Sequence, residues 1–287
     1  MKALCFYEHG DLDVLQYADV PDPNPDRGEV LVRVRACALN HLDIWVREGW
    51  PGLRLEMPHW TGADVAGEVA GLGEGVTGWE VGQRVVVDPG LTTCQDEYTR
   101  RGEDSVSPGY VILGEHVRGG QAELAAVPAS NLLPMPETWD FATAAAPLLV
   151  TLTAWRMLMH RAQLRAGESV LVIGAGGGVN SMAIQIAKLA GATVYALTST
   201  EEKMEKAHEL GADVVLNYCE DPQWSKTLYK MTDRRGVDVV VDNVGQATIT
   251  QSMRAVARGG RIVIVGNTSG PKAEVDIRYI FGKQISL

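Results

Sequence analysis

An apolar run that ends in a cluster of glycines constrains the fold of this 287-residue chain more than any other feature. The run at 169–173 leads into Gly174-Ala175-Gly176-Gly177-Gly178, and residues 182–190 then repeat apolar side chains at helical spacing. A strand, a glycine turn and a helix in this order form a phosphate-binding unit. The glycines let the backbone approach a pyrophosphate, and the helix N-terminus offers unpaired N–H groups. The segment therefore predicts a dinucleotide site.

Apolar segments alternate with helical patterns after this turn. Strands are predicted at 194–197, 214–216, 237–241 and 262–265, and helices at 201–210, 224–231 and 249–257. Ser199 and Glu202 have the spacing of a helix-capping box, and Gly259-Gly260 is placed to end the last helix. Such alternation indicates a doubly wound α/β domain, whose parallel sheet binds ligands at the carboxyl ends of its strands.

The first half of the chain has a different pattern. Residues 30–36 alternate apolar and polar side chains, 67–87 are rich in glycine and valine, and 122–127 form another short apolar segment. Short strands with glycine turns, here expected at 73–75 and at Gly78, are typical of a β-rich domain. We place the domains at 1–132 and 133–287, with the boundary close to the connector Pro134-Met135-Pro136.

Composition narrows the classes of partner and the compartment. A formal net charge of −10 argues against a nucleic-acid or anionic-membrane partner. The four cysteines are scattered without a pairing motif, and the N-terminus lacks the pattern of a signal peptide. The longest apolar region, 142–155, is shorter than a bilayer span. These features predict a cytoplasmic protein.

Four short motifs of the first half, read together with the glycine turn, resemble the medium-chain dehydrogenase/reductase superfamily. They are 28–34, Asn40-His41-Leu42-Asp43, 62–67 and 81–85. The resemblance implies a GroES-like catalytic domain at 1–132, a Rossmann domain at 133–287, an active site in the cleft between them, and a homodimer. It also implies a C-terminal segment that returns to the catalytic domain, which is expected to be missing here.

The zinc ligands of the superfamily are not present at the corresponding positions. Zinc alcohol dehydrogenases carry Cys at the position of Asn40 and His at that of Ala63, and the third ligand segment, 147–150, holds no Cys. The lobe at 89–110 resembles one that binds a structural zinc through four cysteines, and the residues at those positions are Thr93, Asp96, Thr99 and Ser107. The resemblance thus points to the zinc-free quinone oxidoreductase and enoyl reductase branches.

Three polar residues of one motif are candidates for catalysis. Without zinc, hydrogen-bond donors must polarise a substrate carbonyl, and the Asn40 amide can donate in this way. His41 can deliver a proton or contact cofactor phosphate, and Asp43 can orient either group. The alternatives are a turn residue for Asn40, a surface or packed imidazole for His41, and a helix N-cap for Asp43.

The residues after the second predicted strand favour NADP(H) over NAD(H). An NAD pocket usually has an acidic residue there, whereas Thr198 and Ser199 can donate to a 2′-phosphate and Lys203 can supply a charge. Alternatively, Ser199 caps a helix and Lys203 is solvated. The last glycine of the superfamily fingerprint is Asn180, which is expected to alter helix–strand packing. Thr153 joins the set by resemblance. The predicted cofactor-binding residues are Thr153, Gly174, Gly176, Gly177, Gly178, Val179, Thr198, Ser199, Lys203, Tyr218, Asn243, Gly266 and Asn267.

These observations support three functional hypotheses. The first is a zinc-independent oxidoreductase that transfers hydride from NADPH to a quinone, an enal or another activated carbonyl compound. The second is an alcohol dehydrogenase of the same superfamily, suggested by the lobe and by the motif at 40–43. The third is a cofactor-binding protein without catalytic activity, suggested by the lost ligands.

Overall fold

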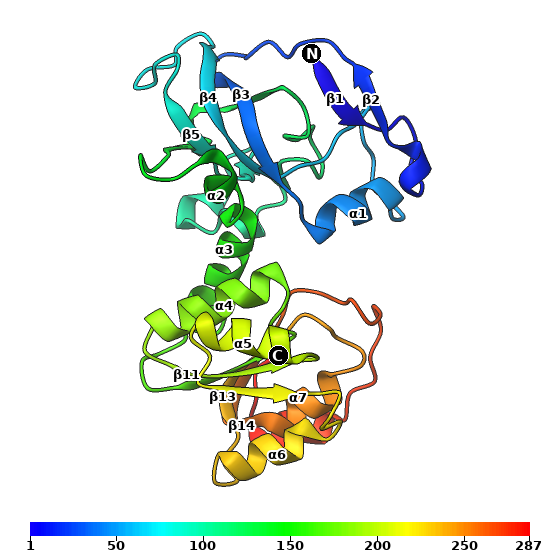
Figure 1. Cartoon of the computed structure of the whole chain (residues 1–287), viewed down its shortest axis with the longest axis vertical. Helices are drawn as coiled ribbons and strands as arrows, with labels where there is room; N and C mark the ends of the chain where they lie inside the picture. Colours follow the sequence, from blue (N-terminus) through cyan, green and yellow to red (C-terminus); the bar gives the residue numbers. More distant parts are fainter. The chain divides into compact units, whose positions relative to one another are not determined.

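The computed structural model describes residues 1–287 as two compact units, Met1–Leu149 and Val150–Leu287 (Figure 1). One unit is built around an antiparallel sheet and the other around a parallel sheet with helices, so the predicted mixed α/β class is confirmed. The domain limit after residue 132 stays a prediction. It lies ahead of the point at which the two compact units divide.

The second unit is a five-stranded parallel sheet in the order β12-β11-β10-β13-β14. Its strands are β10 (Ser169–Ile173), β11 (Thr193–Thr198), β12 (Val214–Asn217), β13 (Val237–Asp242) and β14 (Val256–Ile264). Its helices are α4 (Gly178–Leu189), α5 (Glu201–Glu209), α6 (Trp224–Met231), α7 (Ile249–Ala255) and α8 (Ile277–Lys283). The glycine turn follows the central strand, β10, so it opens at the middle of the sheet's carboxyl edge.

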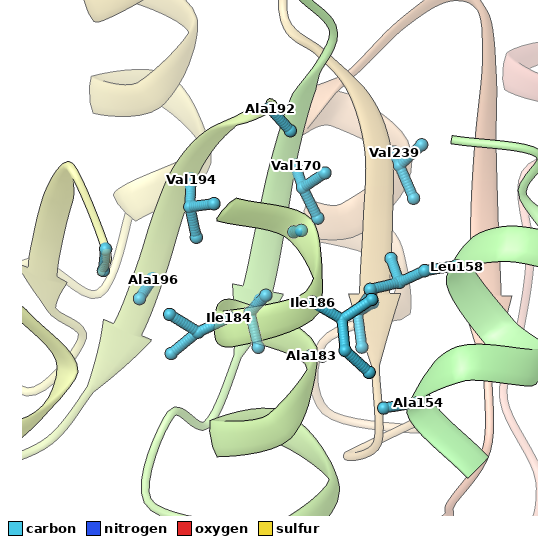
Figure 2. Packing of buried hydrophobic residues seen from close by; sticks show 14 of the residues in the cluster. Ala154, Leu158, Val170, Ala183, Ile184, Ile186, Ala192, Val194, Ala196 and Val239 are labelled. Carbon is cyan, nitrogen blue, oxygen red and sulfur yellow. The ribbon is translucent and has the colours of Figure 1, made fainter. Parts of the chain in front are cut away.

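Both faces of this sheet are covered by apolar side chains. Val170 and Val172 of β10 pack into one cluster together with Ile184 of α4, as Figure 2 shows for Val170 and Ile184. The alternate residues, Leu171 and Ile173, pack into a second cluster on the other face. Successive strand residues point to opposite faces, so a run that is apolar at every position requires cover on both sides. The predicted helical spacing at 182–190 is confirmed by α4.

Two local predictions in this unit were wrong. The cap of α5 is Thr200, whose Oγ1 accepts from the Lys203 N–H at 3.3 Å, so Ser199 and Glu202 do not form the capping box. Helix α7 ends at Ala255 and β14 begins at the next residue, so Gly259-Gly260 lie within the strand segment. The Lys283 ammonium of α8 donates to carbonyls at this helix end, including Met253 O at 3.0 Å, and so satisfies acceptors that the helix leaves unpaired.

The first unit contains an antiparallel sheet in the order β8-β3-β4-β5-β9 and two hairpins, β1-β2 and β6-β7. The strands are β1 (Lys2–Cys5), β2 (Gln16–Asp19), β3 (Glu29–Ala38), β4 (Asp64–Leu72), β5 (Arg84–Val87), β6 (Gly90–Thr92), β7 (Tyr110–Ile112), β8 (Leu124–Pro128) and β9 (Leu132–Pro134). Its helices are α1 (His41–Glu48) and α2 (Phe141–Ala145), and α3 (Leu148–Trp155) starts at its end. Short 3-10 turns occur at Leu12–Val14, Thr99–Arg101, Asp104–Val106 and Ala129–Asn131. Valines of β3, β4 and β5 form its core.

The apolar helical run at 141–161 is longer than the sequence indicated. Its length and composition would suffice to cross a membrane, so the expectation that this region is too short to span a bilayer does not hold for the whole run. About 33% of its apolar window is buried inside the protein. Ala144 and Ala145 belong to a core cluster of the first unit, and Ala154 and Leu158 to one of the second. The run therefore contributes to the cores on either side of the division.

Candidate active site and cofactor site

In the first unit, Asn40 links helix α1 to strand β4. Asn40 is the N-cap residue of α1, and its backbone N–H donates to Asp43 Oδ2 at 2.7 Å. Its side-chain Nδ2 donates to Asp64 Oδ2 at 2.8 Å. The alternative in which Asp43 is the N-cap is therefore wrong, since Asp43 lies inside the first turn and supports the cap.

The two carboxylates also hold backbone groups from other segments. Asp43 Oδ1 accepts from the Gly62 N–H at 3.0 Å, and Asp64 Oδ1 accepts from the Leu149 N–H at 2.7 Å. Asn40 is thus fixed by two acidic residues that are themselves anchored. The motif at 40–43 predicted a role for Asp43, whereas Asp64 was not among the predicted site residues.

Burial dominates the electrostatics of this cluster. Asp64 is 1% exposed, and burial raises its pKa to about 6 against the lowering effect of the hydrogen bonds from Asn40 and Leu149. Burial also raises the pKa of Asp43. The Cys37 thiol has its pKa raised to about 12 by burial and by the two carboxylates, so it stays protonated. No lysine or arginine forms a salt bridge with either Asp43 or Asp64.

His41 does not join this hydrogen-bonded cluster. It is exposed at the start of α1, and its ring stands edge-on to Trp45 with centroids 4.7 Å apart. The structure brings Asn40 and Asp43 together and leaves His41 on the helix surface, in agreement with the alternative of a surface imidazole.

The residues present do not fit a zinc ion. No group of three or more His, Cys, Asp or Glu side chains is arranged to hold a metal. In the lobe, Asp96 Oδ2 accepts from Ser107 Oγ at 2.7 Å, and Asp96 Oδ1 accepts from the Thr99 N–H at 2.9 Å. Thr93 Oγ1 donates to Gly109 O at 2.8 Å. These are the residues at the cysteine positions of related lobes, and here they close the lobe by hydrogen bonds.

In the second unit, the glycine turn is shaped for close approach by a ligand. Gly174 has φ +83°, a conformation that side chains disfavour, and Gly177 is the N-cap of α4. A Cβ built on Gly177 would come no closer than 3.6 Å to any neighbouring atom. The protein itself therefore leaves room for a side chain at Gly177, and the turn fits a dinucleotide pyrophosphate at the helix N-terminus.

Asn180 takes the place of the last fingerprint glycine without disturbing the end of β10. It is 4% exposed, and its Nδ2 donates to Ile173 O at 2.8 Å and to Gly174 O at 2.7 Å. Its Oδ1 accepts from Asn243 Nδ2 at 2.6 Å. The packing change expected at this position thus takes the form of a polar clamp that joins α4, the glycine turn and the end of β13.

Candidate adenosine-side residues follow β11. Thr198 ends the strand and is buried, and Tyr218 follows β12 and donates its N–H to Thr198 O at 3.0 Å. Lys203 is exposed on α5, and a Cβ on Gly176 would lie 3.4 Å from Lys203 Cδ. Lys203 forms no salt bridge, whereas Glu202 pairs with Lys206 at 2.6 Å. The Lys203 charge is therefore available beside the turn.

The remaining candidates lie after β13 and β14 and on α3. A Cβ on Gly266 would come within 2.8 Å of Asn243 O, so this close approach requires glycine. Asn267 belongs to the same loop, whose Gly270 N–H donates to Asn267 O at 2.8 Å. Thr153 lies on α3. The predicted residues that follow β10, β11, β12, β13 and β14 lie at the carboxyl edge of the parallel sheet, and Thr153 lies apart from them in sequence, on α3. Their contacts with a cofactor remain predictions.

Both halves of the chain match known protein families. Residues 26–137 match the alcohol dehydrogenase GroES-like domain, and residues 178–287 match the zinc-binding dehydrogenase family. The quinone oxidoreductase of Mus musculus is 32% identical over 289 residues, covering 100% of this chain and 79% of the relative. A crystal structure of an NAD-dependent alcohol dehydrogenase is 43% identical with a TM-score of 0.96, covering 100% of this chain and 83% of that one.

A mycobacterial protein solved in complex with NADPH is 31% identical with a TM-score of 0.81, covering 100% of this chain and 80% of that chain. The matched relatives are thus oxidoreductases by name, and one of them was solved with a nicotinamide dinucleotide. With its GroES-like and zinc-binding dehydrogenase regions and these matches over the whole of its own length, the chain belongs to the medium-chain dehydrogenase/reductase superfamily.

Proposed function

We propose that this protein transfers hydride from NADPH to a quinone, an enal or another activated carbonyl compound, without zinc. The observation that carries the proposal is the Asn40–Asp64 hydrogen bond of 2.8 Å. It occupies the position at which zinc-dependent members of the superfamily place metal ligands. A fixed amide donor is what a metal-free site needs to polarise an acceptor.

Each residue has a distinct part in this proposal. Asp64 holds one N–H of the Asn40 amide, and the second N–H is left to donate to a substrate carbonyl oxygen. Asp43 fixes the backbone of Asn40. The dinucleotide, when bound, supplies the reducing hydride. The proton that completes reduction of a quinone or enal then comes from solvent. His41 is exposed to this solvent.

The preference for NADPH rests on the residues beside the glycine turn. No acidic residue ends β11, and Lys203 lies next to Gly176 without a salt-bridge partner. The similar NADPH-bound mycobacterial structure agrees with this reading, whereas the NAD-dependent alcohol dehydrogenase shows that NADH use also occurs in close relatives.

Replacing Lys203 with alanine should weaken NADPH binding selectively. Loss of one charge-assisted contact with the 2′-phosphate is expected to cost about 1–2 kcal/mol for NADPH and close to nothing for NADH. Titration of both cofactors by nicotinamide fluorescence measures the difference. Lys206→Ala is the matched control, because Lys206 lies on the same helix and pairs with Glu202. Equal losses for both cofactors in the Lys203 variant would contradict a role in reading the phosphate.

An alcohol dehydrogenase remains the second candidate function. The 43% identity to an NAD-dependent alcohol dehydrogenase is the observation that favours it. Steady-state assays separate the two proposals: NADPH consumption with a panel of quinones and enals supports the first, and oxidation of simple alcohols with NAD supports the second. A protein that binds cofactor and turns over neither panel would instead be a cofactor-binding protein without activity.

The purified protein should contain no stoichiometric zinc. Neither the cluster around Asn40 nor the lobe around Asp96 offers three ligands, so an ion would not be retained. Elemental analysis after dialysis is expected to give well under one zinc per chain, and chelators should leave the melting temperature unchanged. About one tightly held zinc per chain would show that the chain has a metal site.

Three further assignments, of compartment, oligomeric state and partner class, accompany the proposal. We place the protein in the cytoplasm, because Cys5, Cys37, Cys94 and Cys219 are all unpaired thiols. A homodimer is proposed from the family resemblance. The partner class is a small-molecule carbonyl or quinone substrate, with no nucleic acid and no membrane partner.

A further inference from the structure

The side chains of Asn180, which is buried, and Asn243, which is half-buried, form a pair of amides whose orientations are fixed by their surroundings. Asn180 Nδ2 lies within hydrogen-bond distance of two carbonyl oxygens, Ile173 O and Gly174 O. Carbonyl oxygens only accept, so the NH₂ group of Asn180 must face them and its Oδ1 must face away. This Oδ1 lies 2.6 Å from Asn243, so Asn243 must present its NH₂ group to it.

With the two amides in these orientations, one acceptor is left without a donor. With its Nδ2 directed at Asn180, Asn243 has its Oδ1 on the opposite side of the amide. That oxygen is buried, and it is the one buried side-chain nitrogen or oxygen atom in the structure without a hydrogen-bond partner. A buried acceptor without a donor loses its hydrogen bonds to water and gains none from the protein. Native proteins therefore retain such an atom chiefly where function uses it.

The order of the strands indicates which part of a bound dinucleotide would lie near Asn243. β11 and β13 flank β10 on opposite sides of the sheet. The pyrophosphate binds after β10, and the adenosine ribose is read by residues that follow the strand on the β11 side. The other half of the dinucleotide therefore extends toward β13, where Asn243 follows Asp242. The hydrogen-bond donors of that half nearest the pyrophosphate are the two hydroxyls of the nicotinamide ribose.

The loop after β14 packs against the backbone of Asn243. The loop after β14 contacts Asn243 O through the Thr268 N–H at 3.5 Å, which is long for a hydrogen bond. Gly266 lies against the same carbonyl without a side chain. At the residue after Thr268 the loop is anchored, because the Ser269 N–H donates to Val244 O at 3.0 Å. The inference therefore requires Oδ1 to become accessible when the dinucleotide binds, while the Asn180 contact keeps the amide oriented.

We propose that Asn243 Oδ1 accepts a hydrogen bond from a hydroxyl of the nicotinamide ribose, and that Asn180 is the positioning residue that fixes this acceptor. The inference rests on the proposed dinucleotide function and deepens it. It makes Asn180, at a position where the family has glycine, a determinant of how the nicotinamide half is held.

The test compares NADPH with two analogues that lack either the 2′- or the 3′-hydroxyl of the nicotinamide ribose. The wild-type protein should bind one of the analogues about tenfold more weakly than NADPH, the effect of a single hydrogen bond to a buried acceptor. Asn243→Ala and Asn180→Gly should bind NADPH and that analogue equally well. The wild type and Asn243→Ala should bind 2′,5′-ADP alike, because this ligand has no nicotinamide ribose.

Asn217→Ala is the matched control. Asn217 ends β12, an outer strand, and bonds to Glu220 Oε1 at 2.8 Å, so this variant should discriminate the analogues as the wild type does. The measurement on the wild type alone keeps the inference open to refutation if a variant fails to fold. Equal binding of NADPH and both analogues by the wild type would overturn the inference and leave NADPH use intact. Discrimination retained in Asn243→Ala would also overturn it. Absence of any NADPH binding by the wild type would instead refute the proposed function together with it.

Discussion

Replacing Gly177 with valine should abolish binding of both NADPH and NADH while leaving the fold intact. A Cβ at this position meets protein atoms only at 3.6 Å and beyond, which is ordinary van der Waals contact. A bound pyrophosphate would occupy the space in front of the turn, so the added side chain collides with the ligand alone. We expect a loss of more than about a hundredfold in affinity, equivalent to about 2.7 kcal/mol. Fluorescence titration measures binding, and circular dichroism checks folding.

The choice of control for this variant depends on the structure. Gly73 would be a natural choice from sequence as a surface turn, but a Cβ there would overlap Asp26 O and approach Glu29 O. Gly282 on α8 has no atom within 4 Å of its Cβ position and lies in the same unit, so Gly282→Val is the better control. Normal cofactor binding by a folded Gly177→Val protein would show that the phosphate site lies elsewhere.

Replacing Asn40 with alanine should lower kcat by about a hundredfold, with a much smaller change in KM. Removing one donor that stabilises charge on the reacting oxygen typically has an effect of this size. Steady-state kinetics with a quinone or enal acceptor measures the two constants separately. Cofactor affinity should change little, because the assigned role of Asn40 is to donate to the substrate carbonyl oxygen.

Two companion variants test the specificity of that effect. His41→Gln should retain most of the activity, because His41 is exposed and contacts Trp45 rather than the cluster. Asn40→Asp removes the donor and places a third carboxylate next to Asp64, so it should be at least as impaired as Asn40→Ala. A kcat for Asn40→Ala within about threefold of the wild-type value would contradict the assigned role of the amide.

The parallel sheet and its glycine turn could be predicted from sequence, because both depend on local patterns. The run at 169–173 and the spacing at 182–190 became β10 and α4 with little change. The end of α7 could not be predicted. At this end Lys283 of α8, about thirty residues further along the chain, donates to the Met253 carbonyl, a contact that no local pattern signals. Ser199 has a residue type typical of a helix N-cap, but Thr200 caps α5. The backbone of Thr200 is extended, and its side chain accepts from the Lys203 N–H.

The candidate site was only partly visible from sequence for the same reason. A helix start beside Asn40 and Asp43 could be predicted locally, but the N-cap was given as the alternative for Asp43, and the structure has Asn40 in that position. The bond from Asn40 to Asp64 joins β4 to the start of α1, and no pattern in the sequence signals it. The Asn180–Asn243 pair is likewise a contact between distant segments. A sequence motif indicates which residue types are present, whereas contacts between distant segments are known only from the folded structure.

The buried acidic cluster makes the stability of the first unit depend on proton binding. Burial raises the pKa of Asp64 from 3.8 to about 6, so the folded protein binds this proton more tightly than the unfolded chain does. The stabilisation is therefore fully present below about pH 4 and is lost as the pH rises through about 6, a difference on the order of 2–3 kcal/mol. Urea unfolding should show the wild type less stable near pH 7.5 than near pH 4.5. Asp64→Asn cannot ionise, although it loses one of the two accepted hydrogen bonds, so its stability should depend much less on pH. At neutral pH the unit thus keeps an ionised carboxylate that opposes its own folding, a cost typical of positions retained for activity.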